Sequence, residues 1–393
     1  MPRRFIGYGR QSIEQGDIDA VVNCLTGDYL TQGPAIEAFE SSVCEYLGAR
    51  HAVAVSSGTA ALHVAAMAAG AAPGVIGVTQ TMTFVASANS LAYCGADVCL
   101  TDIDPDTMSM SPEALSNHLD RYPQTRIIIP VSMTGLSSNG DALRDVAGRE
   151  RIIIEDASHS LGADREDGTK IGAPGYADMT VFSFHPVKPI TTGEGGIVVT
   201  EDDELARRLR LLRSHGIERD PDALRPGHKG EPWYYEQQEL GLNYRLSDIQ
   251  AALGTAQMGR LDNFIARRRA IAEQYDRRLS GLPHIRRCGA DAGQRARSGH
   301  HLYVIGVDFA AVGKSRSEVM NLLRHHDIGS QVHYIPVHRQ PWWEHRFLNR
   351  TDTFPAAESY YEECLSIPCF PGMSDDEVDH VIETLDGIVN ERI

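Results

Sequence analysis

In the first 200 residues, short apolar runs rich in β-branched residues alternate with stretches whose apolar residues follow helical spacing. The apolar runs predict strands at 51–55, 97–101, 127–131, 151–156, 181–184 and 197–200. The helical stretches predict helices at 17–26, 35–47, 60–69 and 83–92. Because strands that alternate with helices pack into an α/β domain with a mainly parallel sheet, we expect that fold class here.

The remainder of the chain predicts a different arrangement. Residues 203–214 have the pattern of a basic helix, and residues 216–236 contain three prolines and predict a loop. A long helix is expected from residue 245 towards Leu279, and strands are expected at 302–307 and 329–334.

The size of the chain allows two domains. At 393 residues it can bury two hydrophobic cores of ordinary size. We expect a large α/β domain over residues 1–245 and a small C-terminal α+β domain over residues 246–393, with the long helix as the connection.

Composition disfavours several classes of function. The formal net charge of −16 argues against nonspecific binding to nucleic acid or to an anionic membrane. Seven cysteines without a C-x-x-C pair predict reduced thiols. No apolar stretch has the length of a signal-peptide core or a membrane span. We therefore expect a cytoplasmic protein without a nucleic-acid or membrane partner.

One lysine lies between two prolines, in the connector between the strands at 181–184 and 197–200. Pro186 and Pro189 fix their own φ angles and bias the preceding residues away from helix, so Lys188 lies on a stiffened segment. A lysine that does covalent chemistry needs such placement, because its amine must reach a carbonyl carbon and partly lose its proton. The alternative is an ordinary solvated lysine, and the local sequence leaves both open.

Two further strand ends carry polar residues that suit a ligand. Ser57, Gly58 and Thr59 join the strand at 51–55 to a helix, and a helix N-terminus with free N–H groups and hydroxyls is an anion site. The strand at 151–156 ends in Asp156, which is costly to bury unless a cation or donors meet it. The alternative for both places is an ordinary helix cap.

Four motifs spread along the chain occur together: Ser56-Ser-Gly-Thr-Ala-Ala-Leu-His63, Glu155-Asp-Ala-Ser-His159, Ser183-Phe-His-Pro-Val-Lys-Pro-Ile-Thr-Thr-Gly-Glu-Gly-Gly196 and Asn243-Tyr-Arg-Leu-Ser-Asp-Ile-Gln-Ala-Ala-Leu-Gly254. In this combination the chain resembles the DegT/DnrJ/EryC1/StrS sugar aminotransferase family over nearly its whole length. The resemblance implies the aspartate-aminotransferase-like fold, fold type I, with pyridoxal 5′-phosphate (PLP) as the cofactor.

The resemblance also implies roles around the cofactor ring. Lys188 is expected to bond covalently to the cofactor aldehyde and to move the proton between Cα and C4′. Asp156 is expected to keep the pyridine nitrogen protonated. Phe84 is expected to stack on the ring, and His159 to lie close to the ring substituents. The alternatives are an ordinary core aromatic for Phe84 and a satisfied buried histidine for His159.

The cofactor phosphate has its own expected set of residues. Its binding is implied for Ser57, Gly58, Thr59 and Ser183. Asn243 resembles a residue that a neighbouring subunit donates to the phosphate, which implies a homodimer with shared active sites. A local turn or cap role is the alternative for Asn243.

Substrate contacts are implied for Thr31, Arg213, His333 and Tyr334. Arg213-Ser-His-Gly216 and the segment at 232–245 are similar to a branch of the family in pseudaminic acid biosynthesis. That branch aminates C4 of a UDP-linked 4-keto-6-deoxy-N-acetyl-hexosamine, and the family implies L-glutamate as the amino donor. Segments 73–80 and 132–136 depart from the family pattern and leave the exact sugar open.

Other functions stay open beside this one. They are amination of another nucleotide-linked keto-sugar, a PLP-dependent sugar dehydratase, and a non-catalytic regulator. Dehydratase relatives resemble the family with a histidine in place of the lysine, whereas this chain has Lys188. Adjacent histidines, as at 300–301 and 325–326, cannot both face one site on a helix or strand, so we expect no metal. Segment 7–12 resembles the start of a dinucleotide-binding fingerprint, but it follows no strand, and we assign it no role.

Overall fold

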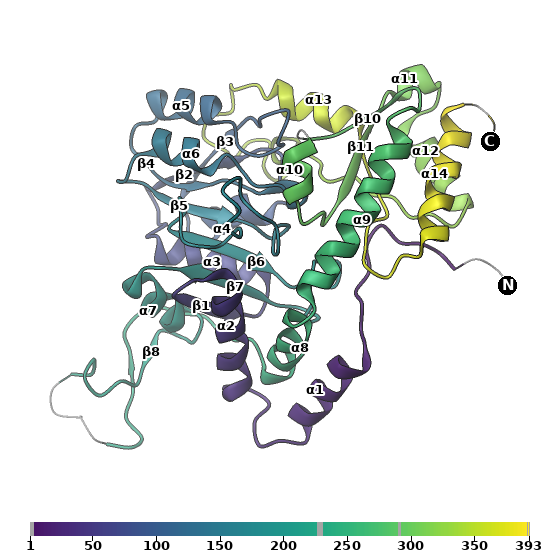
Figure 1. The fold of residues 1–393 in the computed structure, drawn as a ribbon. Helices are drawn as coiled ribbons and strands as arrows, with labels where there is room; N and C mark the ends of the chain where they lie inside the picture. The colour runs from purple at the N-terminus through teal and green to yellow at the C-terminus, as the bar shows by residue number, and fades with distance from the viewer. Residues whose placement is uncertain (1–3, 226–230, 290–291, 391, 393) are drawn as a thin grey trace.

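The computed structural model describes residues 4–225, 231–289, 292–390 and 392 (Figure 1). A seven-stranded sheet in the order β1-β7-β6-β5-β4-β2-β3 forms its larger part. Only β7 runs antiparallel to its neighbours, so the predicted mainly parallel α/β sheet is confirmed. The strands are β1 (His51–Val55), β2 (Ile76–Gln80), β3 (Asp97–Thr101), β4 (Thr125–Ile129), β5 (Ile152–Asp156), β6 (Met179–Ser183) and β7 (Gly196–Thr200).

Helices cover both faces of this sheet, because alternate residues of each buried strand point to opposite sides. On β6, Val181 belongs to one apolar cluster and Phe182 to another. The Val181 side is covered by α3 (Gly58–Ala68), α4 (Ala86–Tyr93) and α7 (Asp203–Leu212). The opposite side is covered by α2 (Pro34–Leu47), α5 (Pro112–Arg121), α6 (Gly140–Ala147) and α8 (Asp248–Met258).

The prediction of one long helix from residue 245 towards Leu279 is wrong. It is two helices, α8 and α9 (Leu261–Leu279), which meet at Gly259 and Arg260. Arg260 has non-helical backbone angles, and its guanidinium pairs with Glu14 and Asp17 at the start of α1 (Gln15–Leu25). This tertiary contact explains the break.

The C-terminal part has a small antiparallel sheet of β10 (Ile285–Arg287), β11 (Tyr303–Val307) and β12 (Cys364–Ile367). The predicted strand at 302–307 is β11. The strand predicted at 329–334 is wrong, since that segment has only one isolated bridge, from Gln331 to Ser366. The surrounding helices are α10 (Ala292–Arg297), α11 (Phe309–Val312), α12 (Arg316–His325), α13 (Pro355–Glu363) and α14 (Asp375–Val389), and 3-10 turns lie at Met133–Gly135 and Val337–Arg339.

Helix α9 contributes to two hydrophobic cores. Ile265 packs with the large sheet, whereas Ile271 and Tyr275 pack with the small sheet. The N-terminal segment also reaches the small core, because Ile6 bridges to Ile328. The domain division at 245/246 stays a prediction.

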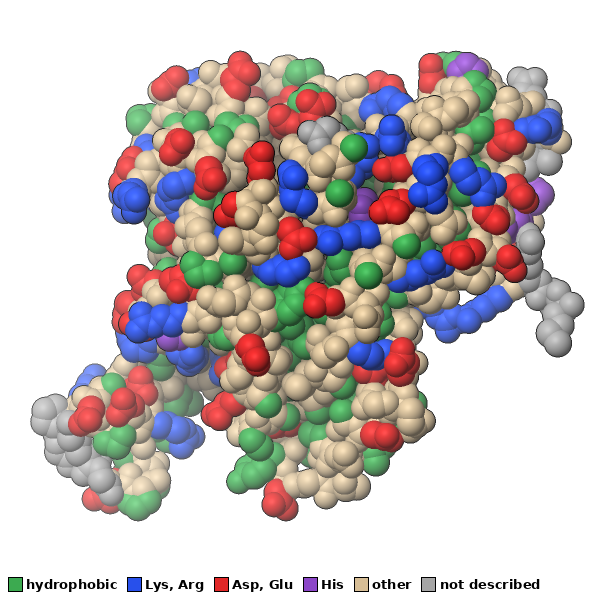
Figure 2. Space-filling model, in the orientation of Figure 1, with side chains coloured by type: hydrophobic (Ala, Val, Ile, Leu, Met, Phe, Trp, Pro, Cys, Tyr) green, Lys and Arg blue, Asp and Glu red, His purple; other side chains and the backbone are tan. Residues whose placement is uncertain are grey.

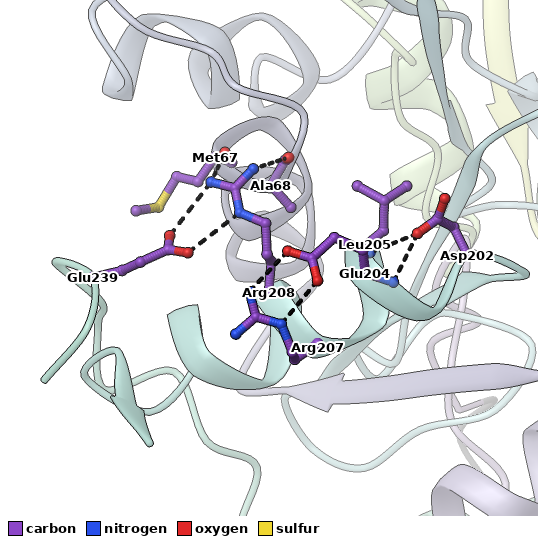
Figure 3. A network of polar contacts seen from close by, with 8 residues as sticks. All are labelled: Met67, Ala68, Asp202, Glu204, Leu205, Arg207, Arg208 and Glu239. Carbon is purple, nitrogen blue, oxygen red and sulfur yellow. Dashed lines mark hydrogen bonds and ion pairs between the residues drawn. The ribbon is translucent and has the colours of Figure 1, made fainter. Parts of the chain in front are cut away.

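The segment predicted as a loop contains a short hairpin of β8 (Ile217–Glu218) and β9 (Glu236–Gln237), and residues 226–230 between them lie outside the described part. Figure 3 shows a network of polar contacts around α7 that reaches Glu239, which lies just after β9. Arg208 on α7 donates to the carbonyl oxygen of Ala68 at 2.6 Å and pairs with Glu239 at 3.4 Å.

The surface has no extended region of one charge on the face in Figure 2, where acidic and basic side chains are interspersed. No helix in the described ranges is both long and apolar enough to cross a membrane.

Candidate active site

The carboxyl ends of β1, β5 and β6 and a C-terminal segment enclose a cavity of about 710 Å³. That volume suits a small-molecule site, and the carboxyl edge of a parallel sheet is where such sites form. Ten of the predicted site residues line this cavity: Ser57, Gly58, Thr59, Phe84, Asp156, His159, Ser183, Lys188, His333 and Tyr334. The fold therefore brings three of the four motifs to one place, together with Phe84 and the pair His333 and Tyr334.

One end of the cavity is the first turn of α3. Ser57 caps this helix, because its Oγ accepts a hydrogen bond from the Ala60 N–H at 3.0 Å. The N–H groups of Gly58 and Thr59 make no hydrogen bond within the described residues and remain open to a ligand. A Cβ on Gly58 would lie 2.7 Å from the Cβ of Ser183, so only glycine lets the helix start approach β6 this closely. This arrangement of free N–H groups at a helix N-terminus suits an anion.

Asp156 also lines the cavity, at the end of β5, and is only 5% exposed. Its carboxylate accepts hydrogen bonds from the Ser87 hydroxyl at 2.7 Å and the Ser158 N–H at 3.1 Å. These donors stabilise the buried negative charge without neutralising it. The carboxylate is therefore available to a cationic ligand group.

Lys188 follows a tight turn in which its N–H donates to the His185 carbonyl oxygen at 2.9 Å. Its amine lies in the cavity, 3.5 Å from Nε2 of His301. Burial lowers the pKa of the Lys188 amine to about 8, and the negative charge of Asp156 opposes that shift. A larger fraction of this amine is therefore neutral at physiological pH than for a solvated lysine.

His159 is held in a defined tautomer. The Thr134 N–H donates to its Nδ1 at 3.3 Å, which leaves the ring proton on Nε2, 3.1 Å from the Tyr334 hydroxyl oxygen. Burial, reinforced by the positive charge of Lys188, keeps the pKa of His159 well below its usual value. The ring is neutral and donates towards Tyr334.

Phe84 is not an ordinary core aromatic, since it is 53% exposed at the cavity. Its ring centroid lies 5.7 Å from that of Tyr334. Its stacking on a cofactor ring stays a prediction. His333 is held by a contact of 2.8 Å between its Nδ1 and the Ser366 hydroxyl, and burial lowers its pKa to about 3, with a further contribution from Lys188.

Three predicted site residues lie outside this cavity. Thr31 bridges to Ser247, and Asn243 bridges to Ser214. Arg213 pairs with Glu40 and donates to the Ala54 carbonyl oxygen. The structure does not bring Thr31 and Arg213 to the Lys188 amine of the same chain, and Asn243 was predicted to serve a neighbouring subunit.

The sequence did not identify three residues of the site. Tyr8 lines the cavity beside His333, Ser87 bonds to Asp156, and His301 contacts Lys188. Tyr8 belongs to the glycine-containing segment that was given no role. His301 belongs to the paired histidines and directly precedes a predicted strand, which is the signal that could have placed it at a sheet end.

PLP fits the arrangement at three points. Its phosphate suits the α3 N-terminus and Ser183, its ring nitrogen suits the buried Asp156 carboxylate, and its aldehyde suits the Lys188 amine. When bound, the cofactor supplies the electron sink for amino-group transfer. The fold and this set of residues define a PLP-dependent transferase of fold type I.

The chain belongs to the DegT/DnrJ/EryC1/StrS aminotransferase family, whose model matches residues 11–386. It is 37% identical over 388 residues to the spore coat polysaccharide biosynthesis protein SpsC of Bacillus subtilis (strain 168), covering 98% of this chain and 97% of SpsC.

Solved structures agree with this family. PseC of Helicobacter pylori, an aminotransferase involved in the biosynthesis of pseudoaminic acid, has a TM-score of 0.87 and 27% identity and covers 99% of this chain and 100% of its own. The PLP form of the putative sugar aminotransferase Spr1654 of Streptococcus pneumoniae has a TM-score of 0.88 and 26% identity, with the same coverage. The chain is thus a PLP-dependent sugar aminotransferase. Within the described ranges, no group of three or more His, Cys, Asp or Glu side chains is placed to hold a metal ion.

Proposed function

We propose that this chain transfers the amino group of L-glutamate to C4 of a UDP-linked 4-keto-6-deoxy-N-acetyl-hexosamine, as in pseudaminic acid biosynthesis. We further propose that it works in the cytoplasm as a homodimer. The observation that carries the chemistry is the convergence of the Lys188 amine, the Asp156 carboxylate and the α3 N-terminus on one cavity. The sugar is supported by the likeness to PseC and by the sequence similarity to that branch.

In this proposal the residues divide the work by position. Ser57, Gly58, Thr59 and Ser183 hold the phosphate end, and Asp156 holds the opposite end of the ring. Lys188 anchors the cofactor and then moves the proton between Cα and C4′, a task that suits an amine whose pKa is lowered to about 8.

The substrate side of the cavity has its own proposed residues. His333 and Tyr334 contact the sugar, and Phe84 and His159 flank the ring. Because His159 is neutral, it adds no positive charge beside Lys188. Burial raises the pKa of Tyr334, so its hydroxyl stays protonated and can act as a donor. Because the His159 N–H already donates to Tyr334, the Tyr334 hydroxyl is the group that can donate a hydrogen bond to a sugar oxygen.

The homodimer is supported by residues that gather away from the cavity. Arg213, Ser214 and Arg245 line a second cavity of about 230 Å³, and Thr31 and Asn243 lie next to its lining residues. A stripe on α1 and after it also exposes Ile18, Val22, Leu25 and Tyr29. We propose that this region faces a second copy and delivers Asn243, Thr31 and Arg213 to the partner's site.

The test uses ¹⁵N-labelled L-glutamate with the PLP-loaded protein and a panel of UDP- and dTDP-linked keto-sugars. We expect ¹⁵N at C4 of the UDP-linked 4-keto-6-deoxy-N-acetyl-hexosamine of L configuration, identified by mass spectrometry and NMR. Label in a different sugar would refute the assigned substrate. Loss of a sugar hydroxyl without label would indicate a dehydratase, and no transfer to any sugar would favour a regulator.

A further inference from the structure

A histidine from the C-terminal part of the chain contacts the reactive amine. Nε2 of His301 lies 3.5 Å from Nζ of Lys188, and the His301 ring centroid is 4.5 Å from that of His159. His301 is 3% exposed, so water does not compete freely for its ring. None of the roles given above to residues around the cofactor uses this side chain.

The position of His301 is fixed from behind by a buried arginine. Arg268 on α9 is fully buried, and its Nη1 donates to the carbonyl oxygens of His300 at 3.1 Å and His301 at 3.2 Å. A charged donor on its backbone holds the residue strongly. The His301 ring is therefore presented to Lys188 by the fold and is not a mobile surface group.

The two ring nitrogens of His301 have different surroundings. Nδ1 is buried and has no hydrogen-bond partner within the described residues, whereas Nε2 faces the lysine. A neutral imidazole carries one N–H and one lone pair. With the proton on Nδ1, a buried N–H would lack any acceptor. With the proton on Nε2, the N–H points at the Lys188 nitrogen and gains a partner.

This tautomer selects one form of the lysine. An ammonium group has three donors and no lone pair, so only the neutral amine can accept a hydrogen bond from Nε2. We propose that His301 donates this hydrogen bond, orients the Lys188 amine and keeps it in the neutral form that attacks a carbonyl carbon. The proposal rests on the proposed role of Lys188 as the reactive amine.

The other charged and titratable groups around the pair do not supply this effect. Asp156 stabilises the ammonium form of Lys188 and so acts in the opposite direction. Burial lowers the pKa values of His159, His301 and His333, so the rings around the amine are neutral. Arg268 acts on His301 and further lowers its pKa. In this proposal the His301 hydrogen bond adds to the effect of burial, and both oppose the effect of Asp156 on the amine.

The test measures the Lys188 amine in the full-length, cofactor-free protein, without sugar or glutamate. Acetic anhydride acetylates neutral amines, and mass spectrometry of the Lys188 peptide across a pH series gives the amine pKa. His301→Phe keeps an aromatic ring but lacks the N–H. We expect this variant to raise the Lys188 pKa by about one unit, which makes the neutral fraction of the amine about tenfold smaller at pH values below the pKa. Lys170, which pairs with Asp164, reports on reagent reactivity in the same sample.

The neighbouring histidine supplies the matched control. His300 is also buried, but its Nε2 faces the Arg295 carbonyl oxygen at 2.9 Å. His300→Asn, which tolerates the positive φ of this position, should leave the Lys188 pKa unchanged. His301→Gln, which keeps an N–H donor, should recover most of the wild-type value.

A wild-type Lys188 pKa in folded His301→Phe would overturn the proposal, as would an equal shift in His300→Asn. Should His301→Phe fail to fold by circular dichroism, His301→Leu lacks the same donor in a smaller side chain and decides the question in the same way. Because no substrate is present, failure of sugar amination would refute only the proposed function, and an unchanged amine pKa would refute only the role of His301.

Discussion

Replacing Gly58 with alanine adds one methyl group at the start of α3, where the structure defines the collision. The new Cβ would lie 2.7 Å from Ser183 Cβ and 2.9 Å from Ser183 Oγ, so the helix start or the end of β6 must move. Overpacking of this kind costs about 1–3 kcal/mol. Alanine regains up to about 1 kcal/mol of helix propensity, so the free energy of unfolding should fall by about 0–3 kcal/mol.

The larger effect should fall on the cofactor. A displaced helix start misaligns the Gly58 and Thr59 amides, and hydrogen bonds to a charged group contribute about 1.5–3 kcal/mol. The dissociation constant of PLP should therefore rise about tenfold to hundredfold, measured by absorbance titration of the cofactor-free protein. Gly16→Ala is the matched control, because Gly16 also lies in a first helical turn and a Cβ there meets nothing within 4 Å.

A second substitution tests the cause of the effect. Ser183→Gly removes both atoms that the new methyl group meets, although it also removes a proposed phosphate ligand. In the double variant Gly58→Ala/Ser183→Gly, the two losses of affinity should be less than additive, with a coupling energy of about 1 kcal/mol or more. Wild-type PLP affinity in Gly58→Ala, or strict additivity in the double variant, would refute the assignment of the α3 start as the phosphate site.

Three further predictions follow from the site and the core. Asp156→Asn keeps the shape of the side chain and one oxygen but removes the charge. The half-reaction with L-glutamate, followed by stopped-flow absorbance, should therefore slow by about 100-fold or more. An unchanged rate would show that the charge of Asp156 does not accelerate this half-reaction. Arg268→Leu leaves the carbonyl oxygens of His300, His301 and Cys369 without their buried donor. In urea unfolding the free energy of unfolding should fall by about 3 kcal/mol or more. The control Arg277→Leu, at an exposed pair with Glu273, should change it little. The pKa of Lys188 is about 8 in the folded protein, whereas its ordinary value is 10.5. Between these two pH values the folded chain binds fewer protons than the unfolded chain, so the free energy of unfolding rises with pH in this range. Relative to Lys188→Met, cofactor-free wild type should therefore become more stable from pH 8 towards 10.5, and a constant difference would contradict the lowered pKa.

Residues within contiguous motifs were predictable from the sequence. Ser57 and Lys188 follow strands whose apolar runs are visible, and Asp156 ends another such strand. The sequence pattern therefore placed each of them near a strand end, and the family resemblance supplied their common role. Tyr8 and His301 could not be assigned, because they reach the cavity through tertiary packing of the N-terminal and C-terminal segments. The strand predicted just after His301 indicates a sheet end, but no local pattern indicates that it lies beside Lys188.

The errors in the fold have the same origin. Strand β2 was missed because Gly77 interrupts its apolar run, yet a Cβ there would lie 2.6 Å from the Leu91 side chain, so close packing of α4 requires the glycine. The break between α8 and α9 depends on Arg260 pairing with the distant α1. In residues 329–334 polar and apolar side chains alternate as in a strand. The segment nevertheless makes a single bridge, and most of it lines the cavity.

The most direct measurement is to locate the cofactor on the chain. Borohydride reduction of the PLP-loaded protein, followed by digestion and mass spectrometry, should find the cofactor mass on the peptide that contains Lys188. Lys170, Lys229 and Lys314 are the other lysines of the chain. Cofactor attached to one of these, or no covalent attachment in a protein that still aminates sugar, would contradict the central role of the Lys188 amine.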